Sequence, residues 1–343
     1  MARIGILTGG GDCPGLNAVI RAVVRKGCQV HGDLIIGFRN GWRGVLDGTV
    51  TELTPQSARG ILHRGGTILG TSRTNPFKIE GGLDLVKENL AGYNIDGLIV
   101  VGGEGTLSCA AAMVREGLNV IGVPKTIDND LASTDYTFGF DTAVQVATDA
   151  IDRLHTTAES HNRVMVLEVM GRHAGWIALY SGLAGGADVI LVPEHPFDLA
   201  EVANHIRHRH AAGHSFSIVV VAEGALPREG TLEIPEYQRD EFGRPRLGGI
   251  SNVIAEEVQR RTGFDTRVTI LGHVQRGGTP TAFDRILATR YGVAAIDLAS
   301  SGSWGQMVSL RGNEVVAVPL DDAVAELKTV PDDLYDVAQV FFG

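Results

Sequence analysis

At 343 residues, with 44% hydrophobic and 20% charged residues, the chain has the composition of a globular protein with one large or two medium-sized domains. Its formal net charge of −10 argues against nucleic acid as the main partner, and no apolar run approaches the roughly 18 residues of a membrane helix. Three cysteines without metal-ligand spacing, and an N-terminus without a signal-peptide pattern, predict a cytoplasmic protein that is not membrane-bound.

Short apolar runs rich in β-branched residues alternate with helical patterns along most of the chain. Such runs are typical of buried parallel strands and occur at residues 3–8, 34–38, 96–103, 119–124, 163–171, 188–193, 217–224 and 267–273. One-sided apolar patterns predict helices at residues 14–29, 142–156, 199–211, 251–261 and 282–298. The alternation predicts an α/β protein with helices on both sheet faces. Residues 225–250 instead hold three of the 12 prolines without periodicity, and we expect a long surface loop there.

Two glycine-rich turns follow predicted strands. "LTGGGDCPGLNAVIR" (7–21) and "VVGGEGTLSCA" (100–110) both read as strand, glycine turn and helix. Glycine lets the backbone approach a ligand, and the N–H groups at a helix N-terminus favour phosphate. The first turn matches neither the Walker pattern nor G-x-G-x-x-G, so by itself it also fits a plain strand–helix connection. Two such turns predict a polyphosphate or nucleotide site, in which Glu104 is well placed to bind Mg²⁺.

The stretch "VPKTIDNDL" (123–131) gathers polar side chains at the end of a predicted strand. Asp128 and Asp130 follow the strand closely, and Thr126 supplies a hydroxyl. Phosphoryl transfer to an alcohol requires a carboxylate that takes the hydroxyl proton, together with cations that hold the transferred group. This cluster contains both kinds of group, since Lys125 adds a cation.

Several arginines stand at similar glycine-rich or strand-end positions, namely Arg73, Arg163, Arg172, Arg267 and Arg276. In an acidic protein this placement predicts an anion site, because guanidinium pairs bidentately with phosphate. The histidines of "HIRHRHAAGH" (205–214) do not share one helical face, so a solvated helix surface is favoured over a metal site.

Taken in order, these motifs are similar to those of one known family. "LTGGGDCPGLNAVIR", "GGTILGTSR", "VVGGEGT", "PKTIDNDL", "DYTFGFDTA", "SHNRVMVLEVMGRHAG", "VPE" and "LGHVQRGGTPTAFDRILA" resemble 6-phosphofructokinase, over residues 4 to about 300. The loop at 225–250 resembles the insertion of the actinobacterial-type, mixed-substrate group, which contains ATP- and pyrophosphate-dependent enzymes. The resemblance implies transfer of a phosphoryl group to the 1-hydroxyl of fructose 6-phosphate, giving fructose 1,6-bisphosphate.

The resemblance also implies the fold and the domains. The family has two Rossmann-like three-layer α/β/α domains with mostly parallel sheets. The nucleotide domain would comprise residues 1–140 plus about 275–325, and the fructose 6-phosphate domain about 141–274 plus the C-terminal tail. Active sites are shared between subunits, usually in a homotetramer.

Site roles follow residue by residue from the matching motifs. Asp128 matches the base that deprotonates the sugar hydroxyl, and Asp130 matches the acid that supports the metal and the base. The complete set of positions that match catalytic residues is Asp128, Thr126, Arg172 and Asp130. The positions that match the donor site are Gly10, Gly11, Ser72, Arg73, Gly102, Gly103, Glu104, Gly105 and Thr106, with Glu104 as the Mg²⁺ ligand. The positions that match the fructose 6-phosphate site are Thr126, Asp128, Arg163, Met170, Gly171, Arg172, Glu223, Arg267, His273 and Arg276, with Arg163 and Arg267 reaching in from a neighbouring subunit.

Two positions give opposite indications about the phosphoryl donor. Lys125 is typical of pyrophosphate-dependent members, whereas Gly105 is typical of ATP-dependent ones. A carboxylate at position 105 would clash with the α-phosphate of ATP, while Lys125 is interpreted as a flexible cation that can bind any phosphate or turn aside. The sequence therefore favours ATP, with pyrophosphate as the alternative.

The chain departs from the family where regulated bacterial members bind effectors. Arg21 and Arg25 are kept, but His155 replaces an arginine. A dinucleotide-dependent oxidoreductase would need an acid about 20 residues after a proper G-x-G-x-x-G, and the pattern is missing. A non-catalytic paralogue would be expected to lose the base or an arginine, yet all of these are present.

Overall fold

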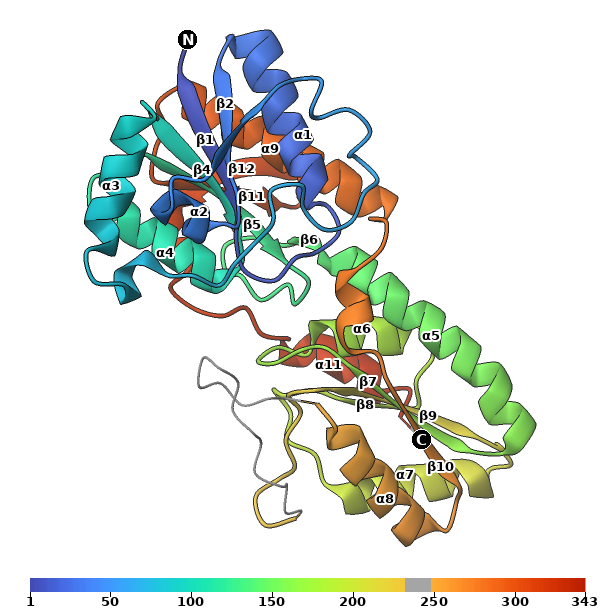
Figure 1. Ribbon diagram of the computed structural model, residues 1–343. Helices are drawn as coiled ribbons and strands as arrows, with labels where there is room; N and C mark the ends of the chain where they lie inside the picture. The colour runs from blue at the N-terminus through green and yellow to red at the C-terminus, as the bar shows by residue number, and fades with distance from the viewer. Residues whose placement is uncertain (232–247, 343) are drawn as a thin grey trace. The chain divides into compact units, whose positions relative to one another are not determined.

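The computed structural model describes residues 1–231 and 248–342 and divides the chain into two compact units (Figure 1). The first unit is formed by Met1–Thr142 and Arg276–Leu327, and the second by Ala143–Gln275 and Lys328–Gly343. Of the loop predicted at 225–250, residues 232–247 lie outside the described residues, and Ile250 already begins a helix.

The first unit is built on an eight-stranded sheet with the order β12-β11-β5-β4-β1-β2-β3, and β6 pairs with β5 beside this path. The strands are β1 (Arg3–Thr8), β2 (Leu34–Phe38), β3 (Val50–Leu53), β4 (Gly97–Gly102), β5 (Val120–Thr126), β6 (Phe138–Gly139), β11 (Gln306–Arg311) and β12 (Glu314–Pro319). The sheet is parallel except for β3 and β12, which pair antiparallel with β2 and β11 at its two edges.

Helices cover both faces of this sheet (Figure 1). The helices are α1 (Leu16–Lys26), α2 (Trp42–Leu46), α3 (Gly82–Gly92), α4 (Glu104–Arg115), α9 (Ala282–Ser300) and α10 (Leu320–Ala323). Side chains alternate along β4: Leu98 and Val100 join the core under α2, α3 and α4. Helices α1 and α9 pack together, with Ile35 and Ile296 both beside Gly27 at the end of α1.

The second unit contains a four-stranded parallel sheet with the order β10-β7-β9-β8. Its strands are β7 (Val164–Val169), β8 (Val189–Leu191), β9 (Ser217–Ala222) and β10 (Thr266–Ile270), and its helices are α5 (Phe140–His161), α6 (Trp176–Ala184), α7 (Leu199–Ala211), α8 (Ile250–Thr262) and α11 (Asp332–Gln339). Helix α5 begins in the first unit and carries the chain into the second. The predicted α/β class with mostly parallel sheets is confirmed.

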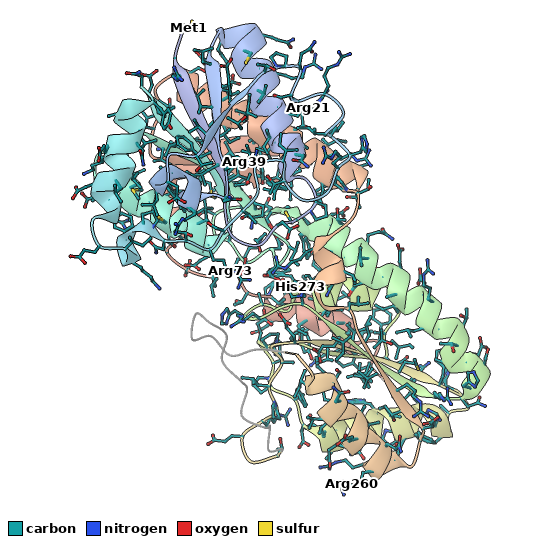
Figure 2. All side chains as sticks on the ribbon, viewed as in Figure 1. Met1, Arg21, Arg39, Arg73, Arg260 and His273 are labelled. Atoms are coloured by element: carbon teal, nitrogen blue, oxygen red, sulfur yellow. The ribbon has the colours of Figure 1, made fainter. Side chains whose placement is uncertain are left out.

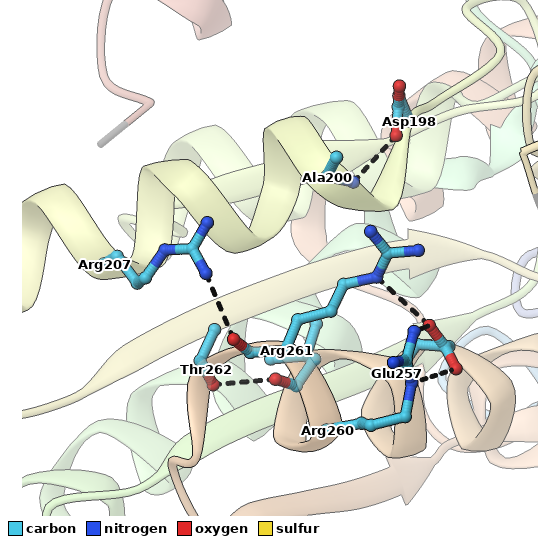
Figure 3. A network of polar contacts seen from close by, with 8 residues as sticks. Asp198, Ala200, Arg207, Glu257, Arg260, Arg261 and Thr262 are labelled. Carbon is cyan, nitrogen blue, oxygen red and sulfur yellow. Dashed lines mark hydrogen bonds and ion pairs between the residues drawn. The ribbon is translucent and has the colours of Figure 1, made fainter.

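Helices α7 and α8 pack side by side over one core of the second unit. Figure 3 shows their polar contacts: Asp198 caps α7 by accepting from the N–H of Ala200 at 2.7 Å, and Arg207 donates to the carbonyl of Arg261 at 3.1 Å. On α8, Glu257 pairs with Arg260 and Arg261, and the hydrogen bond from Arg260 is the largest cause that lowers the pKa of Glu257, to about 2.

The histidines of the 205–214 segment do not all form the solvated surface that we expected. His208 and His214 are exposed, but His210 stacks on Phe264 with ring centroids 3.8 Å apart. His205 is half-buried against the ring of Phe342. Stacking on a neighbouring ring accounts for these two positions. Among the described residues, no helix combines the length and apolar character needed to cross a membrane.

Candidate active site

The Thr126–Asp130 segment forms a braced turn at the end of β5. Asn129 adopts a positive φ of 50°, and its side-chain oxygen accepts from the N–H of Thr137 at 3.0 Å. The hydroxyl of Thr137 donates to the carbonyl of Thr126 at 2.7 Å, and the N–H of Asp128 donates to the hydroxyl of Thr126 at 3.1 Å. These bonds fix where the side chains of the turn lie, so the polar cluster is a defined structure.

Two carboxylates of this turn influence each other electrostatically. Asp128 and Asp130 are both half-buried. Burial, and after it the negative charge of Asp128, raise the pKa of Asp130 to about 6, against hydrogen bonds that lower it. A pair of close carboxylates holds a proton or attracts a cation more readily than either does alone.

Lys125 lies at the first glycine turn. Its side chain is only 3% exposed, and its amine donates to the carbonyl of Gly11 at 2.6 Å. Burial lowers the pKa of Lys125, whereas the nearby acids Asp128 and Asp130 raise it. The interpretation of Lys125 as a flexible side chain is therefore wrong, because burial and a short hydrogen bond hold it in place.

The two glycine turns lie beside each other because β1 and β4 are neighbours in the sheet. The N–H of Gly9 donates to the carbonyl of Val101 at 2.9 Å, and Gly10 has a φ of 79°. The buried side chain of Thr106 fills the space between them, so that a Cβ atom on Gly9 or Gly102 would collide with it. Glycine is required here by close packing as much as by any ligand.

A third segment completes this edge of the sheet. The N–H of Gly10 donates to the carbonyl of Ser72 at 2.9 Å, while the Ser72 hydroxyl donates to the carbonyl of Asn40 at 2.7 Å. The next residue, Arg73, is exposed on the surface of the first unit (Figure 2). The structure thus brings the predicted donor residues of three segments to the carboxyl ends of β1 and β4.

Glu104 and Gly105 form the exposed start of α4. A Cβ atom added to Gly105 would meet no other heavy atom within 4 Å, and Glu104 accepts a hydrogen bond from Ser108 at 3.1 Å. In the described part of the chain, no group of three or more His, Cys, Asp or Glu residues could hold a metal. Mg²⁺ commonly takes one or two carboxylates plus substrate phosphate oxygens and water, so a single exposed Glu104 fits this ion.

Arg276 belongs to the first unit and lies against the first glycine turn. Its guanidinium occupies the space that a side chain on Gly11 would need, and it donates to the carbonyl of Asp12 at 3.5 Å. The structure therefore places Arg276 near Lys125 and the predicted donor residues, although its motif matched the fructose 6-phosphate positions. Its predicted role stays a prediction.

Most other predicted sugar-phosphate residues gather at the carboxyl ends of β7 and β9 in the second unit. Met170, Gly171 and Arg172 follow β7, and Glu223 follows β9, with its N–H donating to the carbonyl of Val169 at 2.8 Å. Gly171 has a φ of 143°, and a Cβ there would lie 2.8 Å from the carbonyl oxygen of Ala174. His273 is exposed in the short helix Gly272–Arg276 (Figure 2).

Arg163 and Arg267 lie at the opposite end of the same sheet. Arg163 directly precedes β7, and both arginines pair with Asp265, at 2.6 and 2.5 Å. The six residues of β7 separate Arg163 from Met170, a span of roughly 20 Å at about 3.3 Å per residue. Within one chain the structure therefore does not bring these two arginines to Met170.

The sequence analysis did not predict the supporting role of three residues. Asn129 and Thr137 brace the turn, and Asp265 joins the two arginines. The asparagine between two aspartates was a usable signal, since Asn tolerates positive φ better than most residues. The Asp265 contacts depend on the parallel pairing of β10 with β7, which local patterns do not reveal.

Comparison with known proteins identifies the family. Residues 3–299 match the phosphofructokinase family. The chain is similar to a pyrophosphate–fructose 6-phosphate 1-phosphotransferase from Amycolatopsis mediterranei, with 59% identity over 99% of this chain and 100% of that protein. It is also similar to an ATP-dependent 6-phosphofructokinase from Corynebacterium efficiens, with 55% identity over 99% of both chains. Phosphofructokinase from Pichia pastoris in the T-state is similar in structure, with a TM-score of 0.83 and 35% identity over 99% of this chain; the chain spans 36% of that protein.

A chain with two mostly parallel α/β units and glycine turns at the carboxyl ends of its strands is, by class, a doubly wound α/β protein that binds its ligand at that edge. The family match over residues 3–299 makes the assignment specific: the chain belongs to the phosphofructokinase family. The resemblance seen in the motifs is thereby confirmed. The relatives are named for two different phosphoryl donors, so family membership by itself leaves the donor open.

Proposed function

We propose that the protein transfers a phosphoryl group from ATP to the 1-hydroxyl of fructose 6-phosphate, giving fructose 1,6-bisphosphate. The observation that carries the proposal is the braced Thr126–Asp130 turn, whose strand β5 is the neighbour of β4 in the sheet. This turn supplies carboxylates on the strand next to the glycine turns that suit a polyphosphate.

The residues take roles that match their surroundings. Asp128 removes the proton from the sugar hydroxyl, Asp130 supports the metal and this base, and Thr126 contacts the substrate and the transferred group. Arg73 and Arg172 neutralise charge on the transferred group, and the backbone of Gly10 and Gly11 borders the donor phosphates. Glu104 holds Mg²⁺, which when bound offsets the negative charge of the donor.

ATP is favoured as the donor because position 105 is open. Gly105 is exposed and has free space where a side chain would stand, so the first turn of α4 leaves room for a phosphate beyond the two that pyrophosphate has. Four ATP-dependent relatives from Corynebacterium and Mycobacterium species, 55–56% identical, are compatible with this choice.

Pyrophosphate is the second candidate donor, on the evidence of Lys125. Its buried amine donates to the carbonyl of Gly11 and so lies at the first glycine turn. Relatives of 58–59% identity from Amycolatopsis and Streptomyces are named for pyrophosphate. A cation at that turn suits a small, highly charged donor that has no nucleoside to add contacts.

The donor residues lie in the first unit, and the fructose 6-phosphate residues Met170, Gly171, Arg172, Glu223 and His273 in the second. Arg163, just before β7, and Arg267, at the start of the neighbouring β10, are too far from Met170 to join that group within one chain. This distance supports an oligomer, by family resemblance a homotetramer, in which they reach the sugar phosphate of a neighbouring subunit. We propose a cytoplasmic enzyme with no membrane or nucleic-acid partner.

A direct turnover experiment tests the proposal. The purified protein is incubated with Mg²⁺ and fructose 6-phosphate, with either ATP or pyrophosphate, and fructose 1,6-bisphosphate is measured; the Asp128→Asn variant is the control for contaminating kinase. Product with ATP and little with pyrophosphate is expected. Product with pyrophosphate alone assigns the second donor, and no product with either refutes the proposed function.

A further inference from the structure

Regular backbone pairing between β10 and β7 gives way where the predicted sugar-phosphate residues begin. The N–H of Leu271, just after β10, donates to the carbonyl of Glu168 at 3.1 Å. The parallel register of the two strands would next join the N–H of Met170 to the carbonyl of Leu271. The chain instead turns away at Gly272, whose φ is 52°, and the Leu271 carbonyl accepts from the N–H of Val274 at 3.4 Å. The N–H of Met170 therefore needs another partner.

The side chain of Gln275 supplies that partner. Its amide oxygen Oε1 accepts from the N–H of Met170 at 3.3 Å, and its amide nitrogen Nε2 donates to the carbonyl of Gly272 at 3.1 Å. One end of the group faces a donor and the other end faces an acceptor, so an amide fits both positions in one orientation only. Gln275 thereby links the end of β7 to the short helix η3 (Gly272–Arg276).

Gln275 is buried, although the residues before it in η3 face outward. Its exposed fraction is 0%, whereas that of Val274 is 61%, and His273 is exposed as well. Burying a glutamine costs side-chain entropy and hydration, and its hydrogen bonds return only a modest net stability. A buried polar group whose bonds are all made can, however, specify one arrangement of the segments that it joins. Here that arrangement is the position of η3 on the end of β7.

The two bonds of Gln275 join segments that carry predicted fructose 6-phosphate residues. Met170 is itself one of these residues and directly follows β7. Gly272 directly precedes His273, another of them. Glu223, at the end of β9, is held to the end of β7 by its backbone N–H, which does not depend on a side chain. The link between the segments of Met170 and His273 does depend on a side chain, that of Gln275.

We propose that Gln275 is a positioning residue for fructose 6-phosphate: it sets the segment of His273 relative to Met170. This inference rests on the proposed function, which assigns both of these residues to the sugar-phosphate site. The buried side chain of Gln275 acts through the backbone groups of Met170 and Gly272.

A variant pair separates this role from a general loss of stability. Gln275→Met keeps a side chain of similar length but removes both bonds, so the buried N–H of Met170 loses its acceptor. The control, Tyr335→Phe, also removes one buried side-chain bond from the second unit, the one from the Tyr335 hydroxyl to the carbonyl of Ile190 at 2.9 Å. Ile190 lies on β8, at the opposite edge of the sheet from β10.

The expected effect of Gln275→Met is on the binding of one substrate. KM for fructose 6-phosphate should rise by about 5- to 20-fold, the scale of one weakened hydrogen bond, while kcat and KM for the donor stay within about threefold. Tyr335→Phe should keep all three within about twofold. Loss of folded protein lowers the apparent kcat but shifts no KM. A KM for fructose 6-phosphate in folded Gln275→Met within about twofold of wild type would overturn the proposal, and so would an equal rise in both variants.

Two further measurements do not need turnover. Calorimetric titration with fructose 6-phosphate alone should give a Kd about 5- to 20-fold higher in Gln275→Met than in wild type. The amide hydrogen of Met170 should exchange faster in Gln275→Met than in Tyr335→Phe when both are compared at equal distance below their unfolding midpoints. An unchanged Kd, or equal exchange in the two variants, would contradict the positioning role.

These measurements also distinguish the failure of this inference from that of the proposed function. If wild type binds fructose 6-phosphate but phosphorylates it with neither donor, the proposed transfer fails, and Kd and exchange still decide the role of Gln275. If wild type binds no fructose 6-phosphate, both proposals fail.

A milder variant keeps the test open if Gln275→Met does not fold. Gln275→Asn keeps the amide on a shorter side chain, which cannot span the distance to both Met170 and Gly272. We expect its KM for fructose 6-phosphate to rise and the amide of Met170 to exchange faster than in wild type. If either quantity equals that of wild type, the proposal is wrong.

Discussion

Replacing Gly105 with aspartate is expected to separate the two donors without disturbing the fold. Gly105 is the second residue of α4, it is exposed, and a Cβ there meets no heavy atom within 4 Å. An acidic residue in the first turn of a helix stabilises it by about 0.3–1 kcal/mol, and the helix propensity of aspartate exceeds that of glycine by about 0.3 kcal/mol. The thermal unfolding midpoint of Gly105→Asp should therefore equal or exceed that of wild type.

The expected effect on ATP use follows from charge. A carboxylate at position 105 would stand near the α-phosphate of ATP, and two like charges about 4 Å apart repel by roughly 4 kcal/mol at an effective dielectric constant of about 20. Screening by Mg²⁺ and water reduces this value, so we expect kcat/KM for ATP to fall by about 10²- to 10³-fold. Pyrophosphate has no third phosphate, so its use should be spared.

Three variants at this position separate bulk from charge. Gly105→Ala adds only a Cβ, Gly105→Asn adds the shape of aspartate, and Gly105→Asp adds the charge; kcat/KM for ATP is measured by formation of fructose 1,6-bisphosphate. We expect kcat/KM for ATP to be highest in the alanine variant, lower in the asparagine variant and lowest in the aspartate variant. An aspartate variant within about tenfold of wild type would refute the charge argument, and an alanine variant as impaired as aspartate would show that the backbone or bulk at 105 matters instead.

Four further outcomes follow from the structure. Asp128→Asn should lower kcat by about 10²- to 10⁴-fold with little change in KM, and near-normal turnover would remove Asp128 as the base. Arg163→Ala and Arg267→Ala should each raise KM for fructose 6-phosphate by about 10- to 100-fold. Mixing either variant with Asp128→Asn under conditions of subunit exchange should restore some activity. A mixture that stays inactive would count against active sites shared between subunits. Lys125→Met should lower kcat/KM for ATP by about 10- to 100-fold, and a loss confined to pyrophosphate would reassign the donor. Because the folded-state pKa of Asp284 is raised from 3.8 to about 6, its contribution to stability is complete below about pH 3.8 and is lost as the pH rises past 6. The free energy of unfolding, measured with urea, should fall between pH 4 and pH 7 by up to roughly 3 kcal/mol more in wild type than in Asp284→Asn. An equal change in the two proteins would contradict the raised pKa.

Local patterns predicted the elements that have one clear period. The helix expected at 199–211 is Leu199–Ala211 in the structure, and the strand expected at 3–8 is Arg3–Thr8. Helix Trp176–Ala184 was not predicted because it is apolar on nearly all sides, so it shows no one-sided pattern. The hairpin of β11 and β12 was missed, although a positive φ at Gly312 marks its turn.

The candidate site was predictable in its residue types but not in its pairings. The Thr126–Asp130 turn follows its strand as expected. The bond from Lys125 to Gly11 joins residues 114 positions apart, and burial rather than any local pattern decides it. The same holds for Asp265, which reaches Arg163 only because β10 pairs with β7.

Lys125 and Gly105 gave opposite indications about the phosphoryl donor, and they lie in different surroundings. These surroundings determine how strongly each residue counts as evidence for one donor. The amine of Lys125 is fixed at Gly11, beside the first glycine turn that the phosphates of either donor would approach, so its charge attracts both. Gly105 stands on the exposed first turn of α4, the position that the proposed function assigns to the α-phosphate of ATP, which pyrophosphate lacks. Specificity is a difference between two binding free energies, and a group that attracts both donors contributes little to that difference. Position 105 can oppose one donor alone, which is why we give its glycine more weight than the buried lysine.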